Sequence, residues 1–382
     1  MPPTLDELRR KKSAKWTVYP PDVLPAWVAD MDFELAPPIR AALDAQLARH
    51  DLGYPPMYER AGLAELFAAR AARRYDWAIS AGDIEFFSDV VQAIYFALLT
   101  LTGSGDGVLI QTPIYPPFLH AVDETGRRRV LCELMPGAER YEIDFDAFDA
   151  AAAQATLLLL CHPHNPTGRA YTQVELERIA EIVLRHDLIV VSDEIHADLM
   201  LDARRHLPFA SLAPEIAART ITLSAASKAF NVAGLCLACA VFGSASLRAR
   251  FAALPKHVRG GRSTMGMTAA AAAWRDGDAW LAETLEILRA NRAALAAHAA
   301  RAWPAIRHFP PEATYLAWLD CRDLELGEEP CRWFLREAKV ALGEGPSFGP
   351  PGVGHVRLNF ATPPAILAAV LDRMSEALAR RA

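Results

Sequence analysis

Three stretches of the sequence share one arrangement and decide the fold class. Residues 156–168 read TLLLLCHPHNPTG, residues 188–196 read LIVVSDEIH, and residues 220–228 read TITLSAASK. Each is a short apolar run followed by polar or small residues. A continuous apolar run, without alternation of apolar and polar residues, is typical of a strand that is covered on both faces. We therefore predict three parallel strands whose ends carry loops with functional groups.

Helical patterns lie between and around these runs. Apolar residues recur at helical spacing in residues 37–49, 62–74, 90–101, 173–185 and 277–300, and further strand-like runs lie at 107–110 and 237–242. Strands that alternate with helices indicate a mostly parallel, doubly wound sheet with helices on both faces. The fold class predicted for this part of the chain is therefore α/β.

The C-terminal part has a different pattern, which predicts a second domain. Residues 315–319 and 355–360 resemble strands of a second sheet, and residues 364–380 resemble a final helix. At 382 residues the chain also exceeds the roughly 250–300 residues at which one core stops growing. We predict a large domain at 45–280 and a smaller α+β domain formed by 1–44 and 281–382. The prolines at positions 20, 21, 25, 37 and 38 favour an extended N-terminal arm across the smaller domain.

Composition and charge argue against several classes of protein. Hydrophobic residues make up 52% of the chain and charged residues 23%, which is ordinary for a globular protein. The net charge is −6 and the basic residues are scattered, so the chain lacks the basic face of a nucleic-acid-binding protein. We find no segment apolar enough to span a membrane and no apolar signal segment at the start, and we expect a cytoplasmic protein.

The six cysteines are dispersed, which favours reduced thiols over a disulfide framework. Cys236 and Cys239 form a C-x-x-C pair, but no second pair lies nearby. We interpret both as buried core thiols and predict no metal site.

The polar residues that follow the three runs suggest a chemistry. Asn165, Asp193 and Lys228 each follow a predicted strand, and the carboxyl ends of parallel strands gather at one edge of a sheet. The Lys228 amine can bond an aldehyde, Asp193 can keep a pyridine nitrogen protonated, and Asn165 can donate to a phenolic oxygen. Taken singly, each residue has a simpler interpretation: Asn165 as a turn residue, Asp193 as a capping or loop carboxylate, and Lys228 as a surface amine. Only their order and placement favour a site for a pyridine cofactor that bears an aldehyde.

A phosphate on such a cofactor would need an anion site. Residues 87–91 open a predicted helix, where free amides such as those of Val90 and Val91 favour an anion. Ser88 as a plain N-cap is an equally good local interpretation. Tyr115 follows the strand predicted at 107–110 and can stack on the cofactor ring, although an isolated tyrosine is more often ordinary core.

The motifs together resemble one known family. The Asn-Pro-Thr-Gly loop, Ser-Asp-Glu-Ile-His and Ser-Lys-Ala-Phe-Asn are similar to fold type I aminotransferase-like enzymes, whose large domain has a seven-stranded type of sheet. Trp-Val-Ala-Asp-Met-Asp-Phe at 27–33, Gly-Tyr-Pro at 53–55, Gln-Thr-Pro-Ile-Tyr at 111–115 and Val-Arg-Leu-Asn-Phe at 356–360 resemble more narrowly the MalY/PatB family of cystathionine β-lyases. The resemblance runs along nearly the whole chain.

The resemblance implies a cofactor and a role for each site residue. It implies pyridoxal 5'-phosphate bound as a Schiff base to Lys228, with Asp193 at the pyridine nitrogen, Asn165 at the ring oxygen and Tyr115 stacked on the ring. It places Arg357, Ala29 and Asp30 at the substrate. It also places His196 at the cofactor and Tyr54 at the partner subunit. Arg357 would bind the substrate α-carboxylate, and Tyr54 would reach the phosphate of the other subunit in a homodimer.

The sequence departs from the family pattern at three positions. Relatives often have a hydroxyl residue where this chain has Ala225, and some have a basic residue where it has Cys236. Ser224 or Ser227, with the Val90 and Val91 amides, would then anchor the phosphate. His162 stands where the family has asparagine, and we favour a repacked turn over a tuned pocket.

The family likeness implies α,β-elimination from L-cystathionine or a related L-cysteine S-conjugate, which yields a thiol, pyruvate and ammonia. An aminotransferase is the first alternative, because the same lysine, aspartate and asparagine serve transamination and a fold does not fix the reaction. A regulatory protein that binds the cofactor with little turnover is the second.

Overall fold

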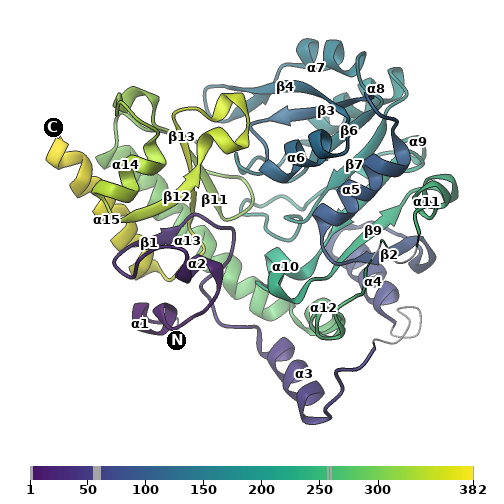
Figure 1. The fold of residues 1–382 in the computed structure, drawn as a ribbon, viewed down its shortest axis with the longest axis horizontal. Coiled ribbons are helices and arrows are strands. Elements are labelled where there is room, and N and C mark those ends of the chain that lie inside the picture. Colours follow the sequence, from purple (N-terminus) through teal and green to yellow (C-terminus); the bar gives the residue numbers. More distant parts are fainter. Residues whose placement is uncertain (1–2, 55–61, 256–257, 259, 382) are drawn as a thin grey trace.

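The structure, a computed structural model, describes residues 3–54, 62–255, 258 and 260–381 and contains two sheets (Figure 1). The large sheet has the strand order β2-β9-β8-β7-β6-β3-β4-β5 and the small one β1-β12-β13-β11-β10. The strands of the large sheet are β2 (Ile84–Phe87), β3 (Gly107–Thr112), β4 (Arg128–Pro136), β5 (Tyr141–Ile143), β6 (Leu157–Cys161), β7 (Ile189–Asp193), β8 (Thr220–Ser224) and β9 (Ala238–Phe242). Those of the small sheet are β1 (Leu24–Ala26), β10 (Arg307–His308), β11 (Leu316–Asp320), β12 (Val340–Glu344) and β13 (His355–Asn359).

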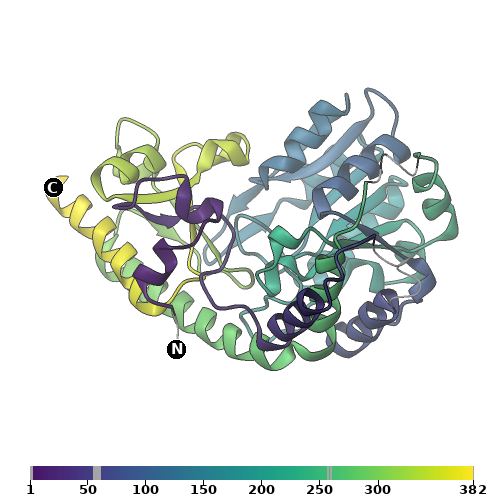
Figure 2. The same ribbon diagram turned by 60° about the horizontal axis from the view of Figure 1, so that its bottom comes forward.

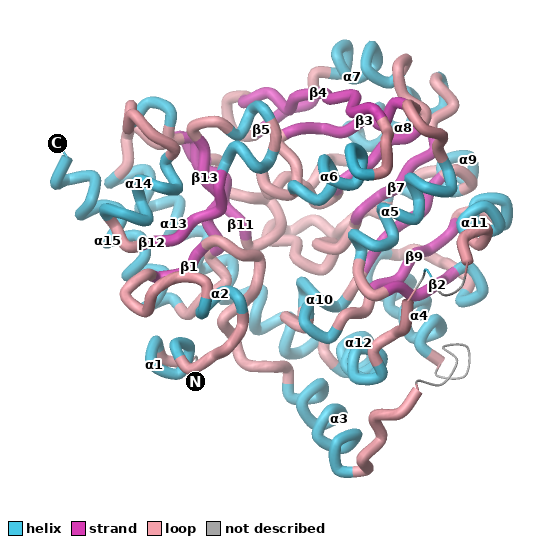
Figure 3. Tube along the Cα trace, viewed as in Figure 1, coloured by secondary structure: helices cyan, strands magenta, loops and turns pink. Residues whose placement is uncertain are grey.

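Helices surround both sheets, and Figure 3 shows the strands as two separate groups between them. The α-helices are α1 (Leu5–Arg9), α2 (Ala14–Thr17), α3 (Pro37–Ala48), α4 (Leu63–Tyr75), α5 (Val90–Leu101), α6 (Pro116–Glu124), α7 (Phe145–Ala152), α8 (Gln173–Arg185), α9 (Pro214–Ala217), α10 (Ala226–Ala229), α11 (Ala245–Phe251), α12 (Thr264–Asp276), α13 (Asp278–Ala302), α14 (Pro330–Glu337) and α15 (Pro364–Arg381). None of the helices in the described part of the chain combines the length and apolar character that a membrane-spanning helix needs.

The large sheet is mostly parallel, as predicted. Strands β4, β3, β6, β7 and β8 run parallel, whereas β9, β2 and β5 each pair antiparallel with their neighbours. The described sheet has eight strands, one more than the expected seven. The additional strand β5 is three residues long and forms a tight antiparallel connection with β4, and so short a segment leaves no periodic signal in the sequence.

The uninterrupted apolar runs are strands covered on both faces. Leu157 and Leu159 of β6 belong to a core cluster that includes residues of α5 and α6. Leu158 and Leu160, which point to the opposite face, belong to a cluster with residues of α7 and α8. Both faces of β6 are therefore apolar because helices cover each of them, and only the end of the strand is left for polar groups.

The long helix α13 runs from the large sheet to the small sheet (Figure 2). The small sheet begins with the N-terminal arm, because β1 pairs in parallel with β12 through Leu24 and Val340. The expectation of a purely extended arm was wrong, since α1 and α2 precede β1. Thr4 and Glu7 form a capping box at the start of α1, a local helix signal that outweighs the prolines farther along. The domain boundaries at residues 44 and 280 stay a prediction.

Candidate active site

A cavity of about 520 Å³ lies at the carboxyl ends of β6, β7 and β8. The predicted residues that line it are Ala29, Val90, Val91, Tyr115, Asn165, Asp193, His196, Ser227, Lys228 and Arg357. The expected gathering of strand-end residues is therefore present, and the small domain adds Arg357 from β13. Ser224, Asp30 and Tyr54 are not among the lining residues.

Lys228 lies in the short helix α10, directly after β8. Its Nζ donates a hydrogen bond to the carbonyl oxygen of Ala29 over 2.9 Å. Burial lowers the pKa of Lys228, while the Asp30 and Asp193 carboxylates oppose this shift and the Arg357 guanidinium adds to it. A lysine amine with a lowered pKa in a cavity can act as a nucleophile or as a base.

Asp193 is the last residue of β7 and is buried. Burial raises the pKa of Asp193 to about 7, and the nearby Glu194 carboxylate adds to the rise. The Ile195 amide, which donates to Asp193 Oδ1 over 3.0 Å, and the Lys228 amine oppose it. A buried carboxylate in this state is suited to pair with a cationic N–H group from a ligand in the cavity.

Asn165 and Arg357 are joined across the two sheets. The Arg357 guanidinium donates from Nη1 to Asn165 Oδ1 and from Nη2 to the Trp27 carbonyl oxygen, each over 3.0 Å. It also lies over the Phe348 ring, 4.9 Å from the ring centre. Because Asn165 Oδ1 is occupied, its Nδ2 is left as the donor toward the cavity.

Arg357 has one hydrogen-bond donor that is not used within the described residues and is available to a ligand. Its Nε is buried and has no hydrogen-bond partner among the described residues. Burial lowers the pKa of Arg357 to about 10, so the guanidinium remains charged at neutral pH, and nearby Tyr115 and Tyr315 act in the opposite direction. A buried cation with an unused N–H group is suited to a carboxylate.

Helix α5 supplies the N-terminal amides of Val90 and Val91 at the cavity wall. The interpretation of Ser88 as the N-cap was wrong, because Asp89 caps the helix and its Oδ1 accepts from the Gln92 amide over 2.7 Å. The Asp89 side chain can reach this amide because Asp89 has extended backbone conformation directly before the helix.

The other predicted cofactor contacts divide into two groups. Tyr115 and His196 line the cavity, and burial raises the pKa of Tyr115 and lowers that of His196 to about 3, so both are uncharged at neutral pH. Ser227 also lines the cavity, whereas Ser224 is buried at the end of β8 away from the lining. Of the two serines proposed for the phosphate, only Ser227 is placed to contact a group in the cavity.

The N-terminal segment 27–33 closes the cavity on the side away from the large sheet. Ala29 lines the cavity, whereas the backbone carbonyl of Asp30 accepts hydrogen bonds from Lys15 Nζ and Asn359 Nδ2. Asp30 is close enough to Lys228 to affect its pKa, although it is not part of the lining. Tyr54 is fully exposed in the single chain and lies outside the cavity.

The sequence departs from the family pattern at Cys236 and His162, and the structure shows the environment of both side chains. The expectation that Cys236 is buried was wrong: it is exposed, because it ends the 3-10 helix η4 (Ala233–Leu235) in left-handed conformation before β9 begins. Cys239, within β9, is buried as expected. His162 is buried outside this cavity and stacks on Tyr171 with ring centres 5.5 Å apart, which fits a repacked turn.

About half of the lining residues were not named as site residues from the sequence, although Ser88 and Asp89 lie in the stretch 87–91 that was predicted to hold an anion. The residues not named are Val28, Ser88, Asp89, Gln92, Tyr95, Cys161, Ile195, Ala225, Ala233 and Leu237. Cys161, Ile195 and Ala225 are direct neighbours of strand-end loops and could have been found from that position alone. Gln92 lies in the first turn of α5 and Tyr95 in the second, close to the predicted amides.

Comparisons with known proteins extend over nearly the whole chain. The sequence profile of the aminotransferase class I and II family matches residues 28–374. The chain is 36% identical over 361 residues to cystathionine beta-lyase PatB of Bacillus subtilis. The aligned region covers 94% of this chain and 93% of the relative. The crystal structure of OvoB matches with a TM-score of 0.92 at 39% identity and covers 97% of each chain. Cystalysin from Treponema denticola, whose structure contains pyridoxal 5'-phosphate, matches with a TM-score of 0.92 at 31% identity over 98% of each chain.

Proposed function

The chain belongs to the aminotransferase class I and II family, and we propose that it is a pyridoxal-phosphate-dependent carbon–sulfur β-lyase. Its substrate would be L-cystathionine or a related L-cysteine S-conjugate, and its products a thiol, pyruvate and ammonia. The architecture, a large mostly parallel sheet with a smaller sheet domain, is that of fold type I enzymes. The observation that carries the proposal is the convergence of Lys228, Asp193, Asn165 and Arg357 on one cavity, together with full-length likeness to PatB.

The residues around the cavity fit pyridoxal phosphate. Lys228 supplies the amine for covalent attachment, Asp193 the carboxylate for the pyridine nitrogen, and Asn165 Nδ2 the donor for the ring oxygen. The phosphate would lie at the Val90 and Val91 amides with the Ser227 hydroxyl. When bound, the cofactor supplies a protonated ring that accepts the electron pair released at the substrate α-carbon.

Arg357 would orient the substrate. Its guanidinium is fixed by Asn165 and Trp27, and a substrate α-carboxylate would satisfy the buried Nε that lacks a partner. A carboxylate held at this point fixes the rotation of the amino acid about its Cα–N bond and so determines which α-carbon bond faces Lys228.

Lys228 would move the α-proton. The lowered pKa of Lys228 increases the fraction of neutral amine that can accept a proton, compared with a lysine of ordinary pKa. The segment 27–33 covers this amine from the other side through the Ala29 carbonyl. Loss of the β-thiolate and hydrolysis of the remaining three-carbon unit would give pyruvate and ammonia.

The test is to assay pyruvate release from L-cystathionine by the purified protein, with and without an added keto acid. A β-lyase should release pyruvate without the keto acid, and Lys228→Ala should abolish this release while retaining the fold. Turnover only when a keto acid is present would assign the protein to the aminotransferases of the same family. No turnover with either addition would contradict both enzymatic functions.

We also propose a homodimer in which Tyr54 reaches the phosphate of the other subunit. Tyr54 is fully exposed on the isolated chain, close to the exposed Leu52, and is therefore accessible to a partner subunit. Sedimentation should give the mass of two chains, and Tyr54→Ala should weaken cofactor retention in the dimer. A monomeric, fully active protein would contradict this assembly.

A further inference from the structure

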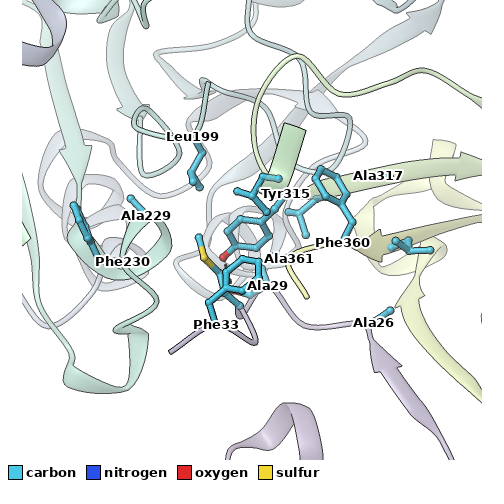
Figure 4. Packing of buried hydrophobic residues seen from close by; sticks show 14 of the residues in the cluster. Ala26, Ala29, Phe33, Leu199, Ala229, Phe230, Tyr315, Ala317, Phe360 and Ala361 are labelled. Atoms are coloured by element: carbon cyan, nitrogen blue, oxygen red, sulfur yellow. Dashed lines mark hydrogen bonds between the residues drawn. The ribbon is translucent and has the colours of Figure 1, made fainter. Parts of the chain in front are cut away.

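The carbonyl oxygen of Ala29 accepts two hydrogen bonds from opposite sides of the cavity wall. One comes from Lys228 Nζ over 2.9 Å and the other from the Tyr315 hydroxyl over 2.8 Å. Figure 4 shows Tyr315 beside Ala29 among the buried residues where the segment 27–33 meets the start of β11. A single backbone oxygen therefore connects the amine at the cavity to a tyrosine behind the wall.

The segment 27–33 has no helix or strand to fix this oxygen. Its neighbours are held by side chains from elsewhere: Asn359 Nδ2 donates to the carbonyls of Val28 and Asp30 over 2.6 and 2.7 Å. Asn231 exchanges two hydrogen bonds with the backbone of Met31. The Tyr315 hydroxyl holds the Ala29 carbonyl, which lies between the two carbonyls that Asn359 binds.

We propose that Tyr315 is a positioning residue whose hydroxyl fixes the Ala29 carbonyl as the acceptor for the free amine of Lys228. Tyr315 is buried and is not among the residues that line the cavity, so it acts through Ala29 and does not touch a ligand. Burial raises the pKa of Tyr315 strongly, so its hydroxyl stays a neutral donor. This inference deepens the proposed function, because it assigns a residue that governs the amine on which that function rests.

The shared oxygen also affects the basicity of Lys228. The charged and titratable groups that face this amine are Asp30 in the segment 27–33, Asp193 at the end of β7, His196 beyond it and Arg357 on β13. All of them remain when the Tyr315 hydroxyl is removed. The Ala29 oxygen then has one donor in place of two and binds the lysine ammonium more strongly, which favours the charged form. The pKa of Lys228 should therefore rise when Tyr315 loses its hydroxyl.

The experiment compares the cofactor-free wild-type protein with Tyr315→Phe. Lysines are labelled with acetic anhydride across a pH series, and mass spectrometry reads the extent of labelling at Lys228. The midpoint for Lys228 should move upward by about one pH unit in the variant. In the loaded enzyme, the variant should lose about tenfold in kcat, with KM changed by less than about twofold, because a larger fraction of the Lys228 amine is protonated and unable to accept the proton while Arg357 is intact.

Tyr171→Phe is the matched control. Its hydroxyl is also buried and donates to Gln111 Oε1 over 3.2 Å, but it lies outside the cavity. This control should leave the Lys228 midpoint unchanged. Placing 4-aminophenylalanine at position 315 restores a donor and should return the midpoint toward the wild-type value, even if the phenylalanine variant folds poorly.

The outcomes separate this inference from the proposed function. An unchanged or lower Lys228 midpoint in Tyr315→Phe overturns the role of Tyr315, whatever reaction the protein catalyses. If the midpoint rises as expected but the wild-type protein releases no pyruvate from cystathionine, the role of Tyr315 stands and the lyase assignment fails.

Discussion

The two sides of the cavity are built in different ways. On the sheet side, Asp193 ends a buried strand and Asn165 and Lys228 each follow one within a few residues, so the strand itself places the side chain. On the opposite side, here called the arm side because the N-terminal arm forms it, the segment 27–33 contributes mainly backbone carbonyls. These are held by Tyr315, Asn231 and Asn359, which are 200 or more residues away in the sequence. The sheet side is therefore fixed locally, whereas the arm side depends on the assembled fold.

The largest expected effect tests how the arm itself is held together. Lys15 Nζ pairs with Asp32 Oδ2 over 2.8 Å, and both side chains are almost fully buried, at 1% and 2% exposed. Lys15→Ala leaves a buried carboxylate without its cation, so the free energy of unfolding should fall by about 3–5 kcal/mol. Urea unfolding measures the loss, and Lys12→Ala, at an exposed position, is the control. A loss no larger than that of the control would mean that the arm side is fixed by other contacts.

The next effect tests the link between the two sides. Arg357 joins Asn165 on the sheet side to Trp27 on the arm side. Lysine keeps the charge but not the planar fork, so Arg357→Lys should raise KM for the amino-acid substrate about 10- to 100-fold, with a smaller change in kcat. Steady-state kinetics measure both constants. Arg322→Lys, whose side chain is half exposed beside Asp320, should change neither, and equal effects of the two substitutions would remove Arg357 from the substrate site.

The third effect concerns the sheet side alone and develops gradually with pH, so it is the smallest over any one pH unit. In the folded cofactor-free protein the pKa of Asp193 is about 7, above its ordinary value of 3.8. The folded state therefore binds this proton more tightly than the unfolded state. Stability contributed by Asp193 should fall as the pH rises from about 4 to about 7, by at most about 1.4 kcal/mol per pH unit, and stay constant above that range.

Asp193→Asn lacks this titration. The free energy of unfolding of the variant, relative to wild type, should therefore increase between pH 5 and 7 and level off at higher pH. Unfolding curves at four pH values measure the difference. Parallel pH profiles for the two proteins would show that the Asp193 carboxyl titrates alike in the folded and unfolded states.

The same contrast explains what the sequence could predict. Strand-end residues such as Asp193 and Lys228 follow from an apolar run and the topology of parallel strands, and helix α5 from its apolar periodicity, so both were predicted. Tyr315 and Asn231 carry no such signal, because an isolated tyrosine or asparagine gains its role only from a contact with a distant segment. Cys236 was predicted to be buried because it lies beside an apolar run, but it is exposed in a left-handed turn before β9 begins.

The arm side was reached only through the resemblance at 27–33. That resemblance placed both Ala29 and Asp30 at the substrate; Ala29 lines the cavity, whereas Asp30 is not among its lining residues. Backbone carbonyls have the same chemistry in every residue, so the sequence could not show that the Ala29 oxygen, and not a side chain, contacts Lys228.

The parallel pairing of β1 with β12 has a consequence for how the protein is made. Leu24 leaves the ribosome early, but its partner Val340 is synthesised more than 300 residues later. At a translation rate of about 5–20 residues per second, the arm remains unpaired for roughly 15–60 seconds before β12 has been synthesised. During that time the large sheet can fold around Asp193 and Lys228, but the cavity stays open on the arm side. The arm is thus translated long before its partner strand and is among the last segments to dock, and a nascent chain halted before residue 340 would carry Lys228 in an unfinished site.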